Sequence, residues 1–126
     1  ISMNIKPTSE FPLLEKYKKR FNPPPTVAYP YGDTIYTDNH LPEYLVIHEQ
    51  EHLKQQKEYG LDTWIDRYFN EDKFRLDMEV RAFRKQLASV KNREDRNGMR
   101  IECAKSLSSE LYGNIISFEN AILCLK

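Results

Sequence analysis

The sequence predicts a mostly helical α+β protein, in which a small β-hairpin or sheet precedes three or more packed helices. Two short β-favouring runs lie close together in the first third of the chain, separated by proline and glycine. The remaining two thirds carry apolar residues at helical spacing. With 126 residues, 40% of them hydrophobic, the chain can build one modest core. We therefore expect one compact domain over residues 3–126, and Ile1 and Ser2 as a remnant of an expression vector.

Charge and apolar runs argue against several classes of function. Lys+Arg and Asp+Glu each number 19, so the net charge is zero and gives no general reason to bind nucleic acid. No apolar run approaches the roughly 20 residues that span a bilayer, and no cleavable signal peptide is visible. The two cysteines fit neither a zinc-finger spacing nor a disulfide framework. We expect a cytoplasmic protein, and the sequence leaves its oligomeric state open.

A short first helix is expected over Ser9–Phe21, because Ser9 can cap it and Pro12 is tolerated in a first turn. The prolines at 23–25 then impose an extended connection. The runs Thr26–Tyr29 and Thr34–Thr37 favour strands, and the segment 30–33 between them contains proline and glycine. This combination predicts a hairpin.

The next helix is expected over Pro42–Tyr59, with proline at its first position and Gly60 as its stop. A short helix should follow from Asp62 through Phe69. A long helix is then predicted over Asn70–Asn97, ended by Gly98, because its apolar residues recur at alternating spacings of four and three: Leu76, Val80, Phe83, Leu87 and Val90.

A further helix is predicted over Met99–Tyr112, closed by Gly113 and Asn114. The tail that follows, residues 113–126, is too apolar to extend freely into water. Two interpretations stay open for it. The tail either completes the core, or folds back over a functional cleft and keeps the protein latent.

The motif His48-Glu49-Gln50-Glu51-His52 lies in the helix expected over Pro42–Tyr59. On a helix, residues four apart share a face, so the imidazoles of His48 and His52 can converge on one metal ion. Glu49 directly follows the first histidine and can reach a water on that metal. This HExxH pattern predicts a metal site.

A catalytic zinc ion needs a third protein ligand besides two histidines. His40 would require a sharp reversal of the chain, and Cys103 has no ligand-like neighbours in its expected helix. Glu79 is the better candidate, because it lies at the margin of the apolar stripe, where an unpaired carboxylate would be costly. We therefore expect one zinc ion on His48, His52 and Glu79.

This ligand set predicts hydrolysis of a peptide bond. Zinc lowers the pKa of water to about 7, and Glu49 would act as general base and then protonate the leaving amine. Tyr68, Tyr112 or an arginine is a candidate for steadying the oxyanion.

His48-Glu49-x-x-His52 followed by Glu79-x-x-Ala82-Phe83 resembles the gluzincin metallopeptidases, and the small size resembles the minigluzincins in particular. The resemblance covers roughly residues 26 to 95. It implies a compact zincin-like domain, zinc on His48, His52 and Glu79, and Glu49 as base. It also implies that the Thr34–Thr37 strand is a sheet edge on which a peptide substrate pairs in extended form.

We therefore expect a zinc-dependent metalloendopeptidase, with a latent zymogen as a further hypothesis in which the Cys124 thiolate could even reach the zinc. Two alternatives stay open. One is a zinc-stabilised structural or regulatory protein without catalysis, of a phage or mobile-element type. The other is a helical interaction module in which HExxH is accidental and no zinc binds.

Overall fold

The computed structural model describes residues 4–126, so the expectation for Ile1 and Ser2 lies outside the described residues. Helices dominate this part of the chain and accompany one three-stranded sheet, which confirms the mostly helical α+β class. The elements are β1 (Asn4–Lys6), α1 (Leu14–Phe21), β2 (Tyr29–Tyr31), β3 (Thr34–Tyr36), α2 (Glu43–Tyr59), α3 (Leu61–Asn70), α4 (Asp72–Ala88), α5 (Arg93–Leu107) and α6 (Phe118–Cys124), with short 3-10 turns at Thr8–Glu10 and Glu110–Tyr112.

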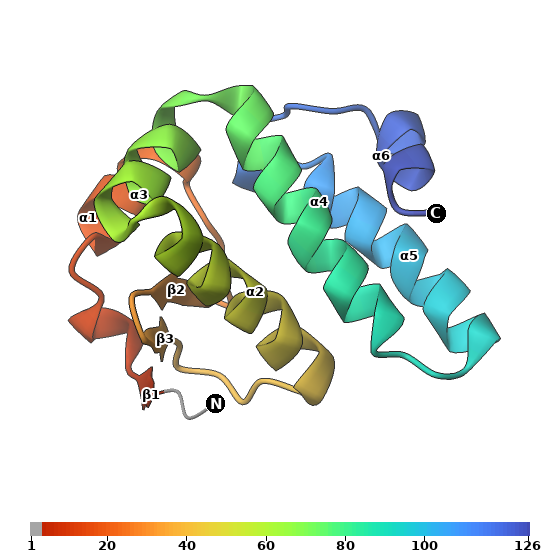
Figure 1. Ribbon diagram of the computed structural model, residues 1–126, viewed down its shortest axis with the longest axis horizontal. Coiled ribbons are helices and arrows are strands. Elements are labelled where there is room, and N and C mark those ends of the chain that lie inside the picture. The colour runs from red at the N-terminus through yellow and green to blue at the C-terminus, as the bar shows by residue number, and fades with distance from the viewer. Residues whose placement is uncertain (1–3) are drawn as a thin grey trace.

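Helix α2 lies at the centre of the arrangement. The small sheet is on one side of it and α4 is on the other, while α5 packs along α4 and α6 packs on α5 (Figure 1). Helices α1 and α3 gather at the end of the molecule where α2 finishes (Figure 1). No helix in residues 4–126 has the length and apolar character needed to cross a membrane.

The sheet has the order β1-β3-β2. Strand β3 pairs in parallel with β1 and antiparallel with β2. The prediction of a hairpin is confirmed, but its first strand covers Tyr29–Tyr31 rather than Thr26–Tyr29, because the turn is made at Gly32 with a φ of +70°. The residues Thr26–Ala28 form an irregular segment before β2.

The expectation that Thr34–Thr37 is a sheet edge is wrong. Strand β3 is the central strand, and the edges among the described residues are β1 and β2. The three residues Asn4–Lys6 are too few for an alternating pattern to mark them as a strand, and the structure leaves all three exposed. The parallel pairing of β1 therefore depends on tertiary contacts that a local pattern does not reveal.

The first helix begins at Leu14 rather than at Ser9, so this boundary was predicted wrongly. Ser9 belongs to a separate 3-10 turn, and Phe11 after it is buried against Tyr29 and Tyr36. Burying the Phe11 ring turns the chain before α1 can begin.

The limits of the motif helix are close to those expected. Pro42 is the N-cap of α2, and Gly60 ends the helix with a φ of +89°, a conformation that favours glycine. Helix α3 then begins at once and buries the aromatic rings of Trp64, Tyr68 and Phe69.

The single long helix expected over Asn70–Asn97 is wrong. Helix α4 ends at Ala88, and α5 begins after Asn92, whose side chain accepts a hydrogen bond from the backbone N–H of Asp95. Gly98 therefore lies inside α5 and does not stop a helix. The helix expected over Met99–Tyr112 is the second part of α5 followed by a 3-10 turn.

The C-terminal residues 113–126 pack into a core cluster. Ala121 and Leu125 are buried against residues of α4 and α5 such as Phe83, Leu87 and Leu107. Two arginine side chains, one from α4 and one from α5, donate hydrogen bonds to the carbonyl groups at the end of α6: Arg84 to Cys124 and Arg100 to Leu125. The tail is therefore a core element in this structure.

Arg75 on α4 is fully buried and joins three segments of the chain. Its guanidinium donates to the backbone carbonyls of Tyr68 and Tyr112 and to the carboxylate of Asp72. These bonds satisfy the buried charge, which would otherwise be costly. Arg75 thereby fixes the backbone positions of two tyrosines.

Gly113 closes the turn over Arg75, and we expect Gly113→Ala to destabilise the fold by about 1 to 3 kcal/mol. Its φ is +94°, and a Cβ there would lie 3.0 Å from Nη2 of Arg75. Chemical unfolding measures the effect. Gly98→Ala is the matched control, because no atom lies within 4 Å of a Cβ in that helical position; it should stabilise by up to about 1 kcal/mol. Equal stability of Gly113→Ala and wild type would contradict the prediction.

Candidate metal centre

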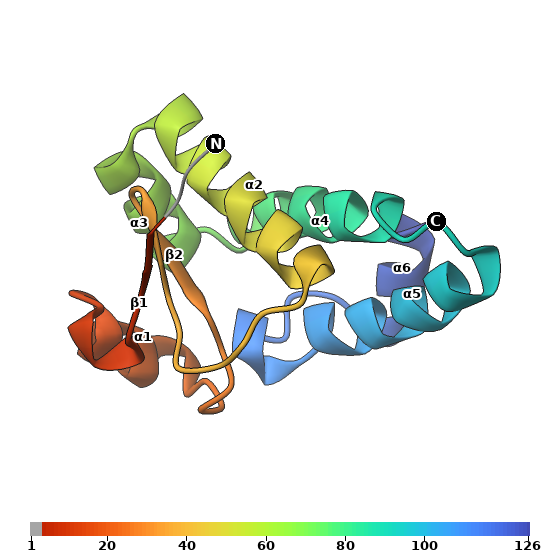
Figure 2. The ribbon, with the colours of Figure 1, turned by 90° about the horizontal axis from the view of Figure 1, so that it is seen from below.

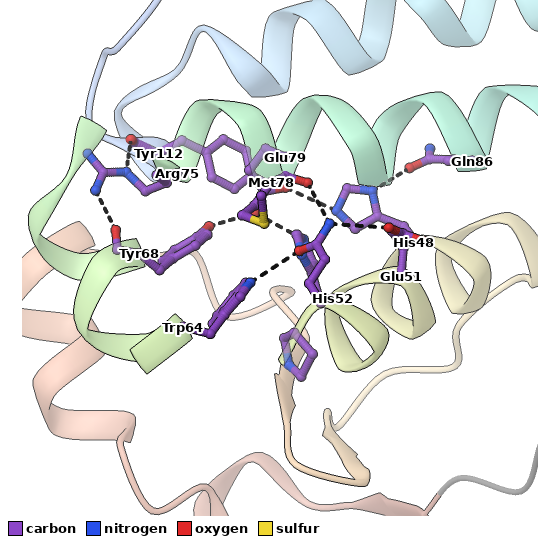
Figure 3. A network of polar contacts seen from close by, with 12 residues as sticks. His48, Glu51, His52, Trp64, Tyr68, Arg75, Met78, Glu79, Gln86 and Tyr112 are labelled. Atoms are coloured by element: carbon purple, nitrogen blue, oxygen red, sulfur yellow. Dashed lines mark hydrogen bonds and ion pairs between the residues drawn. The ribbon is translucent and has the colours of Figure 1, made fainter. Parts of the chain in front are cut away.

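Three predicted ligand side chains meet between α2 and α4. His48 and His52 lie one turn apart on the face of α2 that packs against α4, and Glu79 lies opposite them on α4. Only 5%, 2% and 2% of these residues are exposed. One ligand atom from each lies within 4.8 Å of the others. Figure 3 shows the two imidazoles and the carboxylate turned toward one another.

The distances suit a metal ion. His48 Nε2 lies 3.2 Å from Glu79 Oε1, and His52 Nε2 lies 3.1 Å from Glu79 Oε2. Ligands that bind zinc tetrahedrally at about 2.0 to 2.1 Å are separated from one another by about 3.3 Å. The buried His-His-Glu group could therefore hold a metal ion.

The remaining ring nitrogens of the histidines face glutamine side chains. His48 Nδ1 lies 3.0 Å from Gln86 Oε1, and His52 Nδ1 lies 2.9 Å from Gln55 Oε1. An amide oxygen accepts a hydrogen bond, so Nδ1 of each imidazole carries a proton. A proton on Nε2 is donated to Glu79, and a metal ion would displace that proton and bind the Nε2 lone pair. Gln55 is itself oriented, because it donates to the carbonyl of Met78 and accepts from the indole N–H of Trp64.

Removing the oxygen that orients His48 should weaken metal binding. We expect Gln86→Leu to lower zinc affinity about 10- to 100-fold, because the ring loses the partner that fixes its tautomer. Gln86 is 4% exposed, and leucine has a comparable size. Competition with a chromogenic chelator measures the affinity. An unchanged affinity would show that packing alone orients His48.

Tyr68 forms a hydrogen bond with Glu79, the third predicted ligand. Its hydroxyl donates a hydrogen bond of 2.6 Å to Glu79 Oε2 (Figure 3). A phenol in this position orients the carboxylate and stabilises its charge. Tyr112 is the other tyrosine predicted to stabilise the oxyanion. It lines both of the cavities that His48 also lines.

Burial and charge act against each other in this group. Burial would raise the pKa of Glu79, but the charge of His52 and hydrogen bonds from both histidines hold that pKa well below its usual range. Burial would lower the pKa of His52, but the charge and hydrogen bond of Glu79 outweigh it and raise the pKa to about 9. Burial raises the pKa of the Tyr68 hydroxyl well above its ordinary value, so this group stays a donor.

Glu49 lies beside the centre without belonging to the ligand group. It is partly buried and lines both cavities that flank the histidines, one of about 570 Å³ and one of about 210 Å³. Burial raises the pKa of its carboxyl group, although the charges of His48 and His52 act in the opposite direction. The carboxyl group is thus accessible from the space next to the predicted ligands.

The other ligand candidates lie elsewhere. His40 is exposed in the segment before α2, and Cys103 is a buried member of the α5 core. Within residues 4–126, the group that could hold a metal contains neither of them, nor Cys124. Sequence reasoning missed Gln55 and Gln86, although the position of Gln55 three residues after His52 on the same helix was a usable signal.

No protein-family model, curated protein or solved structure matches the chain.

Proposed function

We propose that the protein is a zinc-dependent metalloendopeptidase of the gluzincin type. The observation that carries this proposal is the buried group of His48, His52 and Glu79, with Glu49 next to it in a cavity. Two imidazoles and one carboxylate form a ligand set typical of catalytic zinc, which keeps a further position open. The glutamines behind the histidines and Tyr68 behind Glu79 support a site built to hold an ion.

Bound in this site, zinc would supply Lewis acidity toward water and toward a peptide carbonyl group. Glu49 would accept a proton from the attacking water at its carboxylate and then deliver it to the nitrogen of the leaving amine. The partial burial that raises its pKa supports this role, because a carboxylate with a raised pKa is a stronger base and accepts a proton from water more readily than an ordinary carboxylate does. Tyr68 would keep Glu79 in place while the substrate reacts.

The substrate would be a peptide in extended form. The segment Thr26–Ala28 lines the smaller cavity together with Glu49 and the ligands. It leads into β2, which is an edge of the sheet. The side chain of Gln56 bonds to the carbonyl of Pro30 and the N–H of Gly32, so this part of the β2 edge is already paired. The N–H of Val27 already donates to the carbonyl of Pro24, so a substrate backbone would pair at Ala28.

Latency through residues 113–126 stays a prediction. Among the described residues that line the two cavities, none follows Tyr112. A latent state that relies on the tail would therefore require α6 to leave its contacts with α4 and α5. Removal of residues 113–126 would also expose that core cluster.

The proposal is tested by adding zinc to the metal-stripped protein and following cleavage of casein, an unstructured protein substrate. We expect cleavage with one equivalent of zinc and none in the presence of a chelator, because the ion supplies the Lewis acid. Magnesium is the control, because it prefers octahedral oxygen ligands. Zinc binding without cleavage of casein or of short unstructured peptides would contradict the proposal.

A further inference from the structure

The larger cavity beside Glu49 is a groove between the beginning of α2 and the length of α5. Figure 2 shows the first turns of α2 above α5. We call this space, of about 570 Å³, the α2–α5 groove. Its lining includes His48 and Glu49 from α2, Phe83 from α4, and Gly98 and Met99 from α5. Because His48 and Glu49 belong to its wall, a molecule in the groove lies next to the proposed reaction centre.

The charged residues on the α5 wall are all acidic. Glu94, Asp95 and Glu102 line the groove, and among the described residues no lysine or arginine does. Lys105 pairs with Glu102 at 3.7 Å, but both side chains are more than half exposed, so water and salt screen this pair. The guanidinium of Arg100 donates hydrogen bonds to the backbone carbonyl of Leu125 and to Oδ1 of Asn97. The groove therefore favours a cation.

Gly98 leaves one position of the groove wall without a side chain. A glycine inside a helix costs about 1 kcal/mol relative to alanine. Nothing lies within 4 Å of a Cβ at this position, so no close packing requires glycine there. The φ angle of Gly98 is not positive, so its backbone conformation does not require glycine either. The effect of glycine at this position is to leave the groove open at its wall.

We propose that the α2–α5 groove is a substrate subsite for an arginine or lysine side chain next to the cleaved bond. This proposal rests on the proposed peptidase function. Met99 and Phe83 offer apolar surface to the aliphatic part of such a side chain, while the acidic residues of the wall meet its charged end. A basic residue can use both surfaces, whereas an acidic residue would be repelled.

The test measures binding without turnover. A fluorescein-labelled peptide of alternating alanine and arginine is titrated with the zinc-loaded full chain carrying Glu49→Gln, and its anisotropy is followed. The same peptide with neutral citrulline in place of arginine is the comparison. We expect the citrulline peptide to bind roughly tenfold more weakly, since several exposed ion pairs are lost. Equal binding of the two peptides would overturn the proposal.

Two groove variants locate the effect. Joint Glu94→Gln, Asp95→Asn and Glu102→Gln should remove the preference for arginine, whereas joint Glu10→Gln, Glu15→Gln and Glu119→Gln should keep it, because those carboxylates are exposed elsewhere. If both triple variants lose the preference equally, general charge attraction explains it and the subsite is refuted. Gly98→Leu should weaken binding of the arginine peptide while thermal unfolding stays at least as high, since leucine favours a helix more than glycine does.

Binding and cleavage separate this proposal from the peptidase itself. Arginine-selective binding to wild type without any hydrolysis would support the groove as a site for a basic side chain and contradict the peptidase. Hydrolysis at equal rates for arginine and citrulline peptides would support the peptidase and overturn the subsite.

Discussion

Replacing Glu79 by alanine is expected to abolish stoichiometric zinc binding. The substitution removes one of three ligand groups, and on the scale of zinc-site free energies the loss of one ligand weakens affinity on the order of a thousandfold. Within residues 4–126, the potential ligand group contains only His48, His52 and Glu79, so no other carboxylate already lies in position to replace Glu79. This is the largest effect that we expect on metal content.

The same substitution should also destabilise the metal-free protein. The hydroxyl of Tyr68 loses the acceptor that lies 2.6 Å away, and the Nε2 atoms of both histidines lose their carboxylate partner. A buried donor left without an acceptor costs about 1 to 3 kcal/mol. The loss of zinc then removes a further stabilisation, because an ion that binds only the folded state favours that state.

Elemental analysis and thermal unfolding with and without a chelator check both expectations. Wild type should hold one zinc per chain and unfold at a lower temperature when the ion is removed. Glu79→Ala should show no effect of the chelator. Asp77→Ala is the matched control, because this exposed carboxylate lies on the same helix and pairs with Lys73, outside the potential ligand group. One firmly held zinc in Glu79→Ala would contradict the three-ligand site.

The fold was predictable where one helix face or one stop residue decided the outcome. Gly60 ended α2 as expected, and the spacing of His48 and His52 placed both side chains on one buried face. The break between α4 and α5 was missed because the apolar spacing continues from Leu87 to Val90. The signal against a continuous helix was present at Asn92, an N-cap residue followed by acidic residues in the first turn.

The predicted ligands of the candidate site could be found from the sequence, but most of the residues that hydrogen-bond to those ligands could not. Glu79 could be found because a carboxylate at the margin of an apolar stripe requires a partner. Gln55 lies three residues after His52 on the same helix, so its spacing was a usable signal. The role of Gln86 could not be assigned, because it depends on how α2 and α4 are rotated against each other. The same is true of Tyr68, whose hydroxyl reaches Glu79 only once α3 has packed on α4. Sequence patterns indicate the faces of single helices, whereas the contacts of Gln86 and Tyr68 require the faces of two helices to be in register.

Replacing Glu49 by glutamine is expected to lower peptide hydrolysis about 10²- to 10⁴-fold, the usual contribution of a general base. Glutamine keeps the size of the side chain but cannot accept a proton from water at neutral pH. Glu49 is not one of the three potential ligands, so the zinc content should stay at one per chain. The fold should also stay, because Glu49 lines two cavities and is only partly buried.

This substitution distinguishes an enzyme from a zinc-stabilised structural protein. In an enzyme, turnover falls while zinc content and unfolding temperature are preserved, whereas in a structural site none of the three changes. Glu43→Gln is the matched control, because this exposed glutamate lies in the first turn of the same helix. Cleavage of casein by the Glu49→Gln variant at the wild-type rate would mean that Glu49 is not the base, even with zinc bound. A chelator added to that reaction would then decide whether the metal site takes part in the cleavage at all, because a contaminating serine protease would continue to act.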